Sequence, residues 1–247
     1  MSLKALVVHV RASPYLSIAT AESYQYRSSY LLPPPSTLIG ALGRSLYHFT
    51  GKGEGYNSEN LRLLKGFVKD VFVKPLSSTL RIGTLIRRLR TLELNESPEI
   101  KRPIDAMVRE QLFTKDLLLI YLIDFALLPT ELLHLMLSLP YSMDRLGDTE
   151  SLISVMNVEM LNVLNLKDEV IVDTYVKRDL LQSFNGNYVA TAFPSLWEPK
   201  KPASYLLPLI SRPQQPGIYD PSTFRATPSK DALALNVSDR CVIITYR

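Results

Sequence analysis

The order in which strand-like and helix-like patterns follow one another over residues 2–164 narrows the possible folds more than any other feature of the sequence. In chain order the pattern predicts a strand at 2–11, a helix at 36–47, strands at 66–76 and 113–125, a helix at 129–140 and a strand at 151–164. This β-α-β-β-α-β order is typical of a ferredoxin-like or RRM-like fold, an antiparallel sheet with two helices on one face. We therefore expect an α+β protein whose first domain spans residues 1–165.

Three other segments complete this plan. Residues 12–32 are polar and aromatic, and we expect a loop there. A basic insertion of about residues 79–112 separates the second and third strands, and it is rich in β-forming residues at its start. Residues 166–247 contain short β-like runs between proline-rich turns, which predicts a small, mostly-β C-terminal region packed on the first domain.

Charge is distributed unevenly along the chain, although the net charge is only +4. Residues 61–90 hold eight Lys and Arg against one acid, and residues 91–150 hold eleven acids against five bases. One interpretation is a basic face that binds a polyanion beside an acidic face that binds a basic partner. The other is an uneven but merely solvated surface, which is the more usual meaning of a charge run.

Three prolines lead directly into the first predicted helix. Residues 33–35 fix an extended entrance, and Ser36 is expected to cap the helix by accepting a backbone N–H. Gly40 and Gly43 each weaken the helix by about 1 kcal/mol relative to alanine. They are explained either by another chain that approaches the helix backbone closely or by tight packing of the helix on the sheet.

Several classes of protein are excluded by composition. The single cysteine, Cys241, rules out a disulfide framework, and no Cys/His spacing is typical of a zinc site. The longest apolar run, residues 117–128, is interrupted by Asp124 and is shorter than a membrane span. We therefore expect a soluble, intracellular protein with no membrane partner, no metal and no cofactor.

Two motifs carry a resemblance to a known family. The run PPSTLIGAL at residues 34–42, preceded by an aromatic-rich loop, resembles the N-terminal signature of the CRISPR-associated RAMP family numbered five. The run RLGDTESLISV at residues 145–155 resembles a second family motif in its glycine, glutamate and serine, but its arginine precedes the glycine instead of following it. The resemblance covers residues 1–165 well and the rest loosely, and chain size and cysteine content favour the archaeal subtype I-A branch.

The resemblance implies a non-catalytic, RNA-binding subunit of a type I CRISPR effector complex (Cascade), which acts in antiviral defence in the cytoplasm. Such a subunit binds the 5′ handle of the CRISPR guide RNA and caps the backbone filament. Its protein partners are the backbone RAMP subunit and the large subunit of the same complex. The resemblance also implies that the insertion at 79–112 is a basic β-hairpin that reaches over the RNA.

RNA phosphates are bound by clustered Lys and Arg, and unpaired bases stack on aromatic rings. On these grounds the candidate RNA-binding residues are Tyr26, Arg27, Ser36, Gly40, Arg44, Arg81, Arg87, Arg88, Arg90, Lys101, Arg102, Arg109 and Arg145. Arg88 and Arg90 share one side of an expected strand, with Arg87 opposite, so we expect Arg88 and Arg90 to act together. The tyrosines of the 12–32 loop either stack on bases or anchor the loop to the sheet.

Two alternative functions stay open. The first is a metal-independent endoribonuclease that processes CRISPR precursor RNA, as in the family's subtype-C branch. His48, beside Tyr47 and one turn from Arg44, is the plausible general acid or base for it, since His9 lies in an apolar strand and His134 in an apolar helix. The second alternative is a structural scaffold that contacts only protein.

Overall fold

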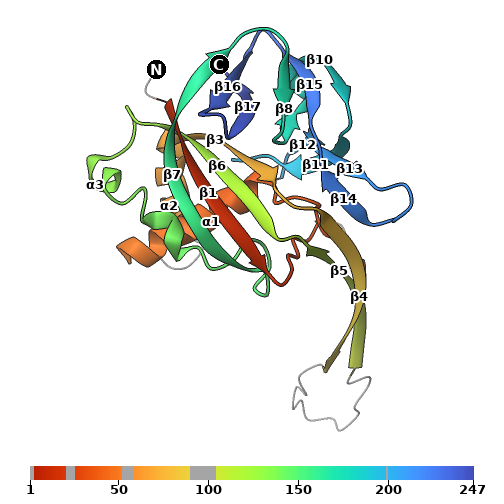
Figure 1. Cartoon of the computed structure of the whole chain (residues 1–247). Coiled ribbons are helices and arrows are strands. Elements are labelled where there is room, and N and C mark those ends of the chain that lie inside the picture. Colours follow the sequence, from red (N-terminus) through yellow and green to blue (C-terminus); the bar gives the residue numbers. More distant parts are fainter. Residues whose placement is uncertain (1–2, 21–25, 52–57, 90–103, 199) are drawn as a thin grey trace.

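The computed structural model describes residues 3–20, 26–51, 58–89, 104–198 and 200–247 (Figure 1). Its centre is a six-stranded sheet in the order β17-β16-β7-β1-β6-β3, in which every neighbouring pair is antiparallel. The strands are β1 (Leu3–Ser13), β3 (Val68–Pro75), β6 (Asp116–Asp124), β7 (Leu152–Leu166), β16 (Ala232–Val237) and β17 (Cys241–Tyr246). β1 therefore lies inside the sheet, between β6 and β7.

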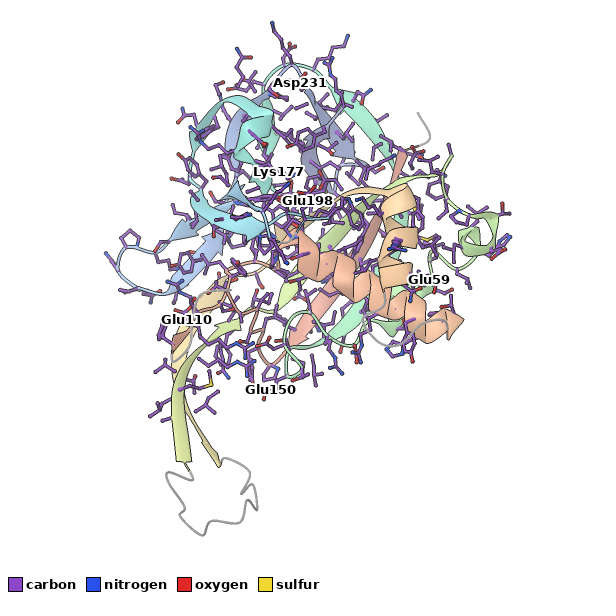
Figure 2. All side chains as sticks on the ribbon, turned by 180° about the vertical axis from the view of Figure 1, so that it is seen from behind. Glu59, Glu110, Glu150, Lys177, Glu198 and Asp231 are labelled. Atoms are coloured by element: carbon purple, nitrogen blue, oxygen red, sulfur yellow. The ribbon has the colours of Figure 1, made fainter. Side chains whose placement is uncertain are left out.

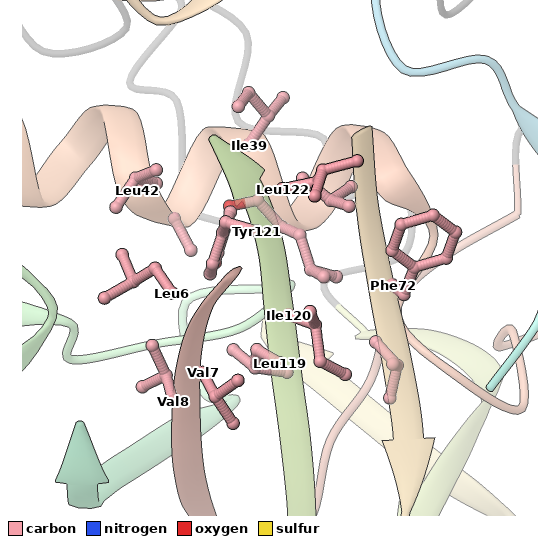
Figure 3. Packing of buried hydrophobic residues seen from close by; sticks show 14 of the residues in the cluster. Leu6, Val7, Val8, Ile39, Leu42, Phe72, Leu119, Ile120, Tyr121 and Leu122 are labelled. Atoms are coloured by element: carbon pink, nitrogen blue, oxygen red, sulfur yellow. The ribbon is translucent and has the colours of Figure 1, made fainter. Parts of the chain in front are cut away.

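Two helices cover one face of this sheet (Figure 1): α1 (Pro35–Thr50) and α2 (Ser58–Phe67). The hydroxyl of Tyr121 points from β6 to α1, where it donates to the carbonyl oxygen of Leu38 at 3.1 Å (Figure 3). Leu38, Leu42 and Leu46 of α1 are fully buried against the sheet. These leucines recur at helical spacing and thus form the core face of α1.

The predicted cap of α1 is wrong. The cap position is Pro34, and no side chain caps the helix. Pro35 is the first helical residue, where a proline fits because its missing N–H would have no partner anyway. Ser36 therefore lies inside the first turn.

The second predicted helix is also wrong in its extent. Residues 129–140 form only one helical turn, α3 (Thr130–Leu133), and a 3₁₀ turn, η1 (Leu139–Ser142), follows. Pro140 lies in the first turn of η1, where its missing N–H is tolerated, so the apolar run is divided between two short turns. Leu132 and Leu139 are buried.

The basic insertion forms an antiparallel strand pair, β4 (Thr79–Leu89) and β5 (Ile104–Phe113), which projects away from the body (Figure 1). We call this pair the β4–β5 arm. β5 ends at Phe113, so the strand expected at 113–125 begins only at Asp116, as β6.

The arm belongs to a second sheet, in the order β13-β14-β4-β5-β2. Its other strands are β2 (Tyr26–Arg27), β13 (Leu209–Ser211) and β14 (Ile218–Pro221). β2 lies in the segment that we expected to be loop, and it pairs with β5 in parallel. Segments from both ends of the chain therefore hold the arm where it leaves the body.

The C-terminal region is mostly β, as expected. Two three-stranded sheets have the orders β10-β15-β8 and β11-β12-β9. Their elements are β8 (Val170–Val172), β9 (Val176–Lys177), η2 (Arg178–Leu180), β10 (Leu181–Gly186), β11 (Val189–Pro194), β12 (Pro202–Leu207) and β15 (Phe224–Pro228). β16 and β17, however, extend the central sheet, so that sheet crosses the domain boundary expected near residue 165.

The central sheet is curled, because its two edge strands contact each other. Thr245 of β17 donates to Asp70 of β3 at 2.9 Å, and Lys74 of β3 donates to the carbonyl oxygen of Arg240, just before β17, at 2.6 Å. Asp70 is buried by this contact. Burial raises the pKa of its carboxyl from 3.8 to about 6, although the charge of Lys177 and bonds from Val71 and Thr245 oppose the change.

Candidate RNA-binding site

Arg109 occupies the centre of a polar network at the root of the arm, where β5 meets the body. Only 8% of this residue is exposed. Its Nε donates to Ser17 Oγ at 2.9 Å and its Nη1 to Glu150 Oε2 at 2.9 Å, while Nη2 donates to Asp148. Arg27 approaches the same Asp148 carboxylate at 3.6 Å. The guanidinium of Arg109 is therefore engaged by the protein itself.

Glu110, the next residue on β5, organises the opposite face of the arm. It is 6% exposed, and its carboxylate accepts hydrogen bonds from the Tyr26 hydroxyl at 2.5 Å and the Ser29 backbone N–H at 2.9 Å. Arg81 of β4 lies 3.8 Å from the same carboxylate. Figure 2 shows Glu110 and Glu150 near the root of the arm. Two buried side chains thus attach the arm to the 15–29 segment from both faces.

The motif at residues 145–155 supplies the other half of this attachment. Gly147 has φ +114°, and a Cβ there would lie 2.8 Å from the carbonyl oxygen of Ser17, so only glycine fits. Ser151 Oγ accepts from the Ser17 N–H at 2.8 Å and donates to the Ser17 carbonyl at 3.1 Å. Glu150 pairs with Arg109. The motif residues hold the 145–151 loop against the arm.

Arg44 and Arg145 meet at a single carboxylate, that of Asp144. Arg44 Nη2 donates to Asp144 Oδ2 at 3.1 Å, and its Nε lies 3.0 Å from Oδ1 without the alignment of a hydrogen bond. Arg145 Nη2 donates to Oδ2 at 3.2 Å. Partial burial alone would raise the pKa of Asp144, but the bond from Arg145 and the charge of Arg44 lower it below its usual value. The cluster keeps one positive charge in excess.

The two glycines of α1 have different surroundings. Gly43 is buried, and a Cβ there would lie 3.3 Å from the side chain of Leu61, so it permits close packing of α1 on α2. For Gly43 the packing explanation applies, with a helix and not the sheet as the neighbour. Gly40 and Ser36 lie on the half-exposed side of α1, and Arg44 follows one turn later.

Two of the remaining basic candidates lie near the outer end of the arm. Arg87 and Arg88 belong to β4, and their backbones pair with Ala106 and Asp105. Three candidates lie outside the described residues: Arg90, Lys101 and Arg102.

The histidine candidate lies apart from the arm root. His48 is exposed in the last turn of α1, and the centroids of the Tyr47 and His48 rings are 5.7 Å apart. Sequence reasoning missed a different cluster on the sheet, in which His9 Nε2 and Arg11 Nε lie 3.2 and 3.0 Å from Asp116 Oδ1. Arg11 and Asp116 are direct cross-strand partners, so only the strand register could have predicted it.

The described part of the chain gives no sign of a metal centre or a membrane span. Within the described ranges, no three His, Cys, Asp or Glu side chains gather as metal ligands would. Among the helices of the same ranges, none has the length and apolar character that crossing a membrane requires.

Comparison with solved structures identifies the fold. A crystal structure of a CRISPR protein from Archaeoglobus fulgidus superimposes with a TM-score of 0.66 at 15% identity, over 99% of each chain. A chain of a CRISPR RNA-guided surveillance complex is a weaker match, with a TM-score of 0.44 at 14% identity over 98% of this chain and 90% of that one. The fold is thus that of the Archaeoglobus CRISPR protein.

Sequence comparison then gives the family. The CRISPR-associated protein Cas5 of Methanocaldococcus jannaschii is 35% identical over 221 residues, which cover 86% of this chain and 87% of that protein. No protein-family model matches the sequence. The chain belongs to the Cas5 family of CRISPR-associated proteins, and the resemblance seen in its two motifs is confirmed.

Proposed function

We propose that this protein is a non-catalytic subunit of a CRISPR effector complex that binds the 5′ handle of the guide RNA and caps the backbone filament. Membership of the Cas5 family supports a role in such a complex. On this proposal the strands β7-β1-β6-β3 with α1 are the ferredoxin-like core of a RAMP domain, and the β4–β5 arm is its inserted basic hairpin. The protein partners are the backbone RAMP subunit and the large subunit.

The observation that carries the proposal is the arm, which projects from the body while its root is held by buried polar contacts on both faces (Figure 1). Such an arm is positioned before RNA arrives, so little ordering entropy is lost on binding. Arg87 and Arg88 lie near the outer end of β4, and Arg90 follows in the sequence, so this part of the chain supplies the cations for phosphate contacts. We assign Arg109 to positioning the arm and not to phosphate contact, because its guanidinium already binds Ser17, Asp148 and Glu150.

Replacing both Arg88 and Arg90 with alanine is expected to weaken binding of a labelled single-stranded repeat RNA. Each lost phosphate contact makes the slope of log affinity against log salt less negative by about 0.7, so the pair should change it by about 1.4. Binding titrations by fluorescence anisotropy at several salt concentrations measure both quantities.

The matched control is Arg240→Ala, because Arg240 pairs with Glu159 beside the turn from β16 to β17, away from the arm. It should leave affinity and slope unchanged. If the double variant behaves like the control, the arm does not bind RNA as proposed, and if the wild type binds no RNA, the protein is a protein-only scaffold.

One observation favours endoribonuclease activity as a second candidate: His48 is exposed, with the Tyr47 ring beside it. On the main proposal we expect the wild type to leave a labelled repeat hairpin intact in EDTA. A single cut that is slowed about a hundredfold in His48→Ala, the usual loss on removing a general acid or base, and retained in His134→Ala, would replace the main proposal. The products are separated by denaturing gel electrophoresis.

A further inference from the structure

One face of the arm root presents an aromatic ring in a fixed position. Tyr26 is 50% exposed, yet its hydroxyl is held by the buried carboxylate of Glu110 at 2.5 Å. This bond, more than the slight desolvation, raises the pKa of Tyr26, so the phenol stays neutral. Within the described part of the chain, no aromatic or cation–π contact occupies the faces of this ring.

Strand register defines what lies beside Tyr26. Residues directly opposite each other on paired strands share a face of the sheet. Tyr26 pairs with Val108, and Glu110 pairs with Gly83. Arg81 and Leu85 lie two residues from Gly83 on either side, so they share this face too. We call it the platform face: Tyr26, Arg81, Gly83, Leu85, Val108 and Glu110.

The opposite face is occupied by the protein itself. Arg27 pairs with Arg109 on that face, and both side chains reach Asp148. The two faces of the arm root therefore have different tasks. One face attaches the arm to the 145–151 loop, whereas the other keeps half of an aromatic ring in solvent.

The chemistry of the platform face fits an unpaired nucleobase. Tyr26 offers a flat surface, and Leu85, 60% exposed, extends the apolar area. Val108 of β5 pairs with both Tyr26 and Leu85, so its half-exposed side chain lies between them and continues the apolar surface, and Gly83 adds no side chain beside it. Arg81 supplies a cation at the edge, over the Tyr219 ring at 5.7 Å. A ring for stacking beside a cation for the backbone is the usual combination in sites for single-stranded nucleic acid.

We propose that the platform face is a stacking site for one unpaired nucleobase of the bound RNA, with the Tyr26 ring as the stacking surface and Glu110 as the residue that positions it. This inference rests on the proposed RNA-binding function and assigns a nucleobase as the group that the platform face binds. A tyrosine that merely anchored a loop would bury its ring, whereas Tyr26 keeps half of its surface in solvent while its hydroxyl binds Glu110.

The test combines protein variants with an abasic scan of the RNA. Tyr26→Leu removes the ring, and Tyr26→Phe keeps the ring but loses the bond to Glu110. The probe is a labelled single-stranded repeat RNA, and in a series of copies each nucleotide in turn lacks its base. Tyr141→Leu is the matched control, because Tyr141 is 56% exposed on η1 and lies off the arm.

Tyr26→Leu is expected to lower affinity roughly five- to hundredfold, the range for loss of one base–aromatic stack. Tyr26→Phe should lose less, because the ring remains. The salt slope should not change in either variant, since no cation is removed. One abasic position should weaken binding to the wild type by a similar factor and should have almost no further effect on Tyr26→Leu. That coupling identifies the base that stacks.

Two results would overturn the inference alone. One is a Tyr26→Leu protein that binds RNA as tightly as Tyr141→Leu. The other is an abasic scan whose losses are the same in wild type and Tyr26→Leu at every position. Failure of the wild type to bind any RNA would instead overturn the proposed function and the platform together, so the two failures are distinguishable.

Discussion

Replacing Arg109 with methionine is expected to lower the free energy of unfolding by about 3 kcal/mol, the scale of breaking a buried ion pair by removing one partner. Methionine keeps most of the side-chain length but removes every donor. Asp148 loses its short contact with Arg109, and the Ser17 hydroxyl loses a donor. The effect should be smaller than for a fully buried pair, because the side chain of Glu150 is 55% exposed and can be hydrated. Urea denaturation measures the change.

The matched control for this variant is Arg240→Met, which breaks an ion pair with Glu159 at 3.0 Å whose arginine is 55% exposed. Exposed pairs contribute about 0–1 kcal/mol, so the control should stay within that range. RNA binding provides a second measurement. If Arg109 positions the arm, its loss should weaken binding without changing the salt slope. Equal destabilisation by both variants, or a flatter slope for Arg109→Met, would contradict the positioning role.

Part of the order of elements was predictable, because the periodicity of apolar residues follows their burial. β1, β6 and β7 were expected at nearly their observed positions, since each is rich in Val, Ile and Leu, although only β1 and β6 are mostly buried and β7 is largely half-exposed or exposed. α1 was expected from its apolar stripe. β2 could not be predicted, because a two-residue strand exists only through its parallel partner β5. The segment at 129–140 was misjudged because its apolar residues, at 132, 133, 135, 136, 137 and 139, fit a helical pattern, whereas the chain forms only two short turns there.

The sequence indicated which basic side chains belong to the candidate site, but not which acidic side chains pair with them. Arginines of the arm and of the 145–151 loop were recognised as a group. The acids that engage them were not, since Asp148 and Glu150 lie 39 and 41 residues from Arg109 in sequence. An arginine in a basic insertion resembles a surface residue until the fold brings acids to it. Burial of Glu110 likewise depends on Ser29 and Tyr26, which come from the segment expected to be loop.

At each pH we compare the free energy of unfolding of Asp70→Asn with that of the wild type. This difference is expected to favour the variant more at pH 8 than at pH 4. The pKa of Asp70 is about 6 in the folded protein against 3.8 as its ordinary value. The folded state therefore binds this proton more tightly than the unfolded chain. Well below pH 3.8 the carboxyl is neutral in both states. As the pH rises from about 4 to above 6, ionisation destabilises the folded wild type by roughly 3 kcal/mol.

Asparagine removes this penalty because it has no charge to bury. Its amide oxygen can still accept a hydrogen bond from the Val71 N–H. Its NH₂ group can donate to the Thr245 hydroxyl, so both partners of the carboxylate are retained. The stability difference between variant and wild type should thus grow by about 3 kcal/mol between pH 4 and pH 8. Thermal or urea unfolding at a series of pH values measures this difference.

Asp116→Asn is a control with the opposite sign. Slight burial alone would raise the pKa of Asp116, but the bonds and charges of Arg11 and His9 lower it below its ordinary value. The wild-type carboxylate is therefore stabilising above the unfolded pKa, and that stability is lost as the pH falls through the folded pKa. Asp116→Asn should destabilise the protein at pH 8 and less so in acid.

A result in the same direction for Asp70→Asn would contradict the prediction. It would mean that the carboxyl of Asp70 is charged where β3 meets β17. An ion, and not a neutral hydrogen bond, would then join the two edge strands of the curled sheet.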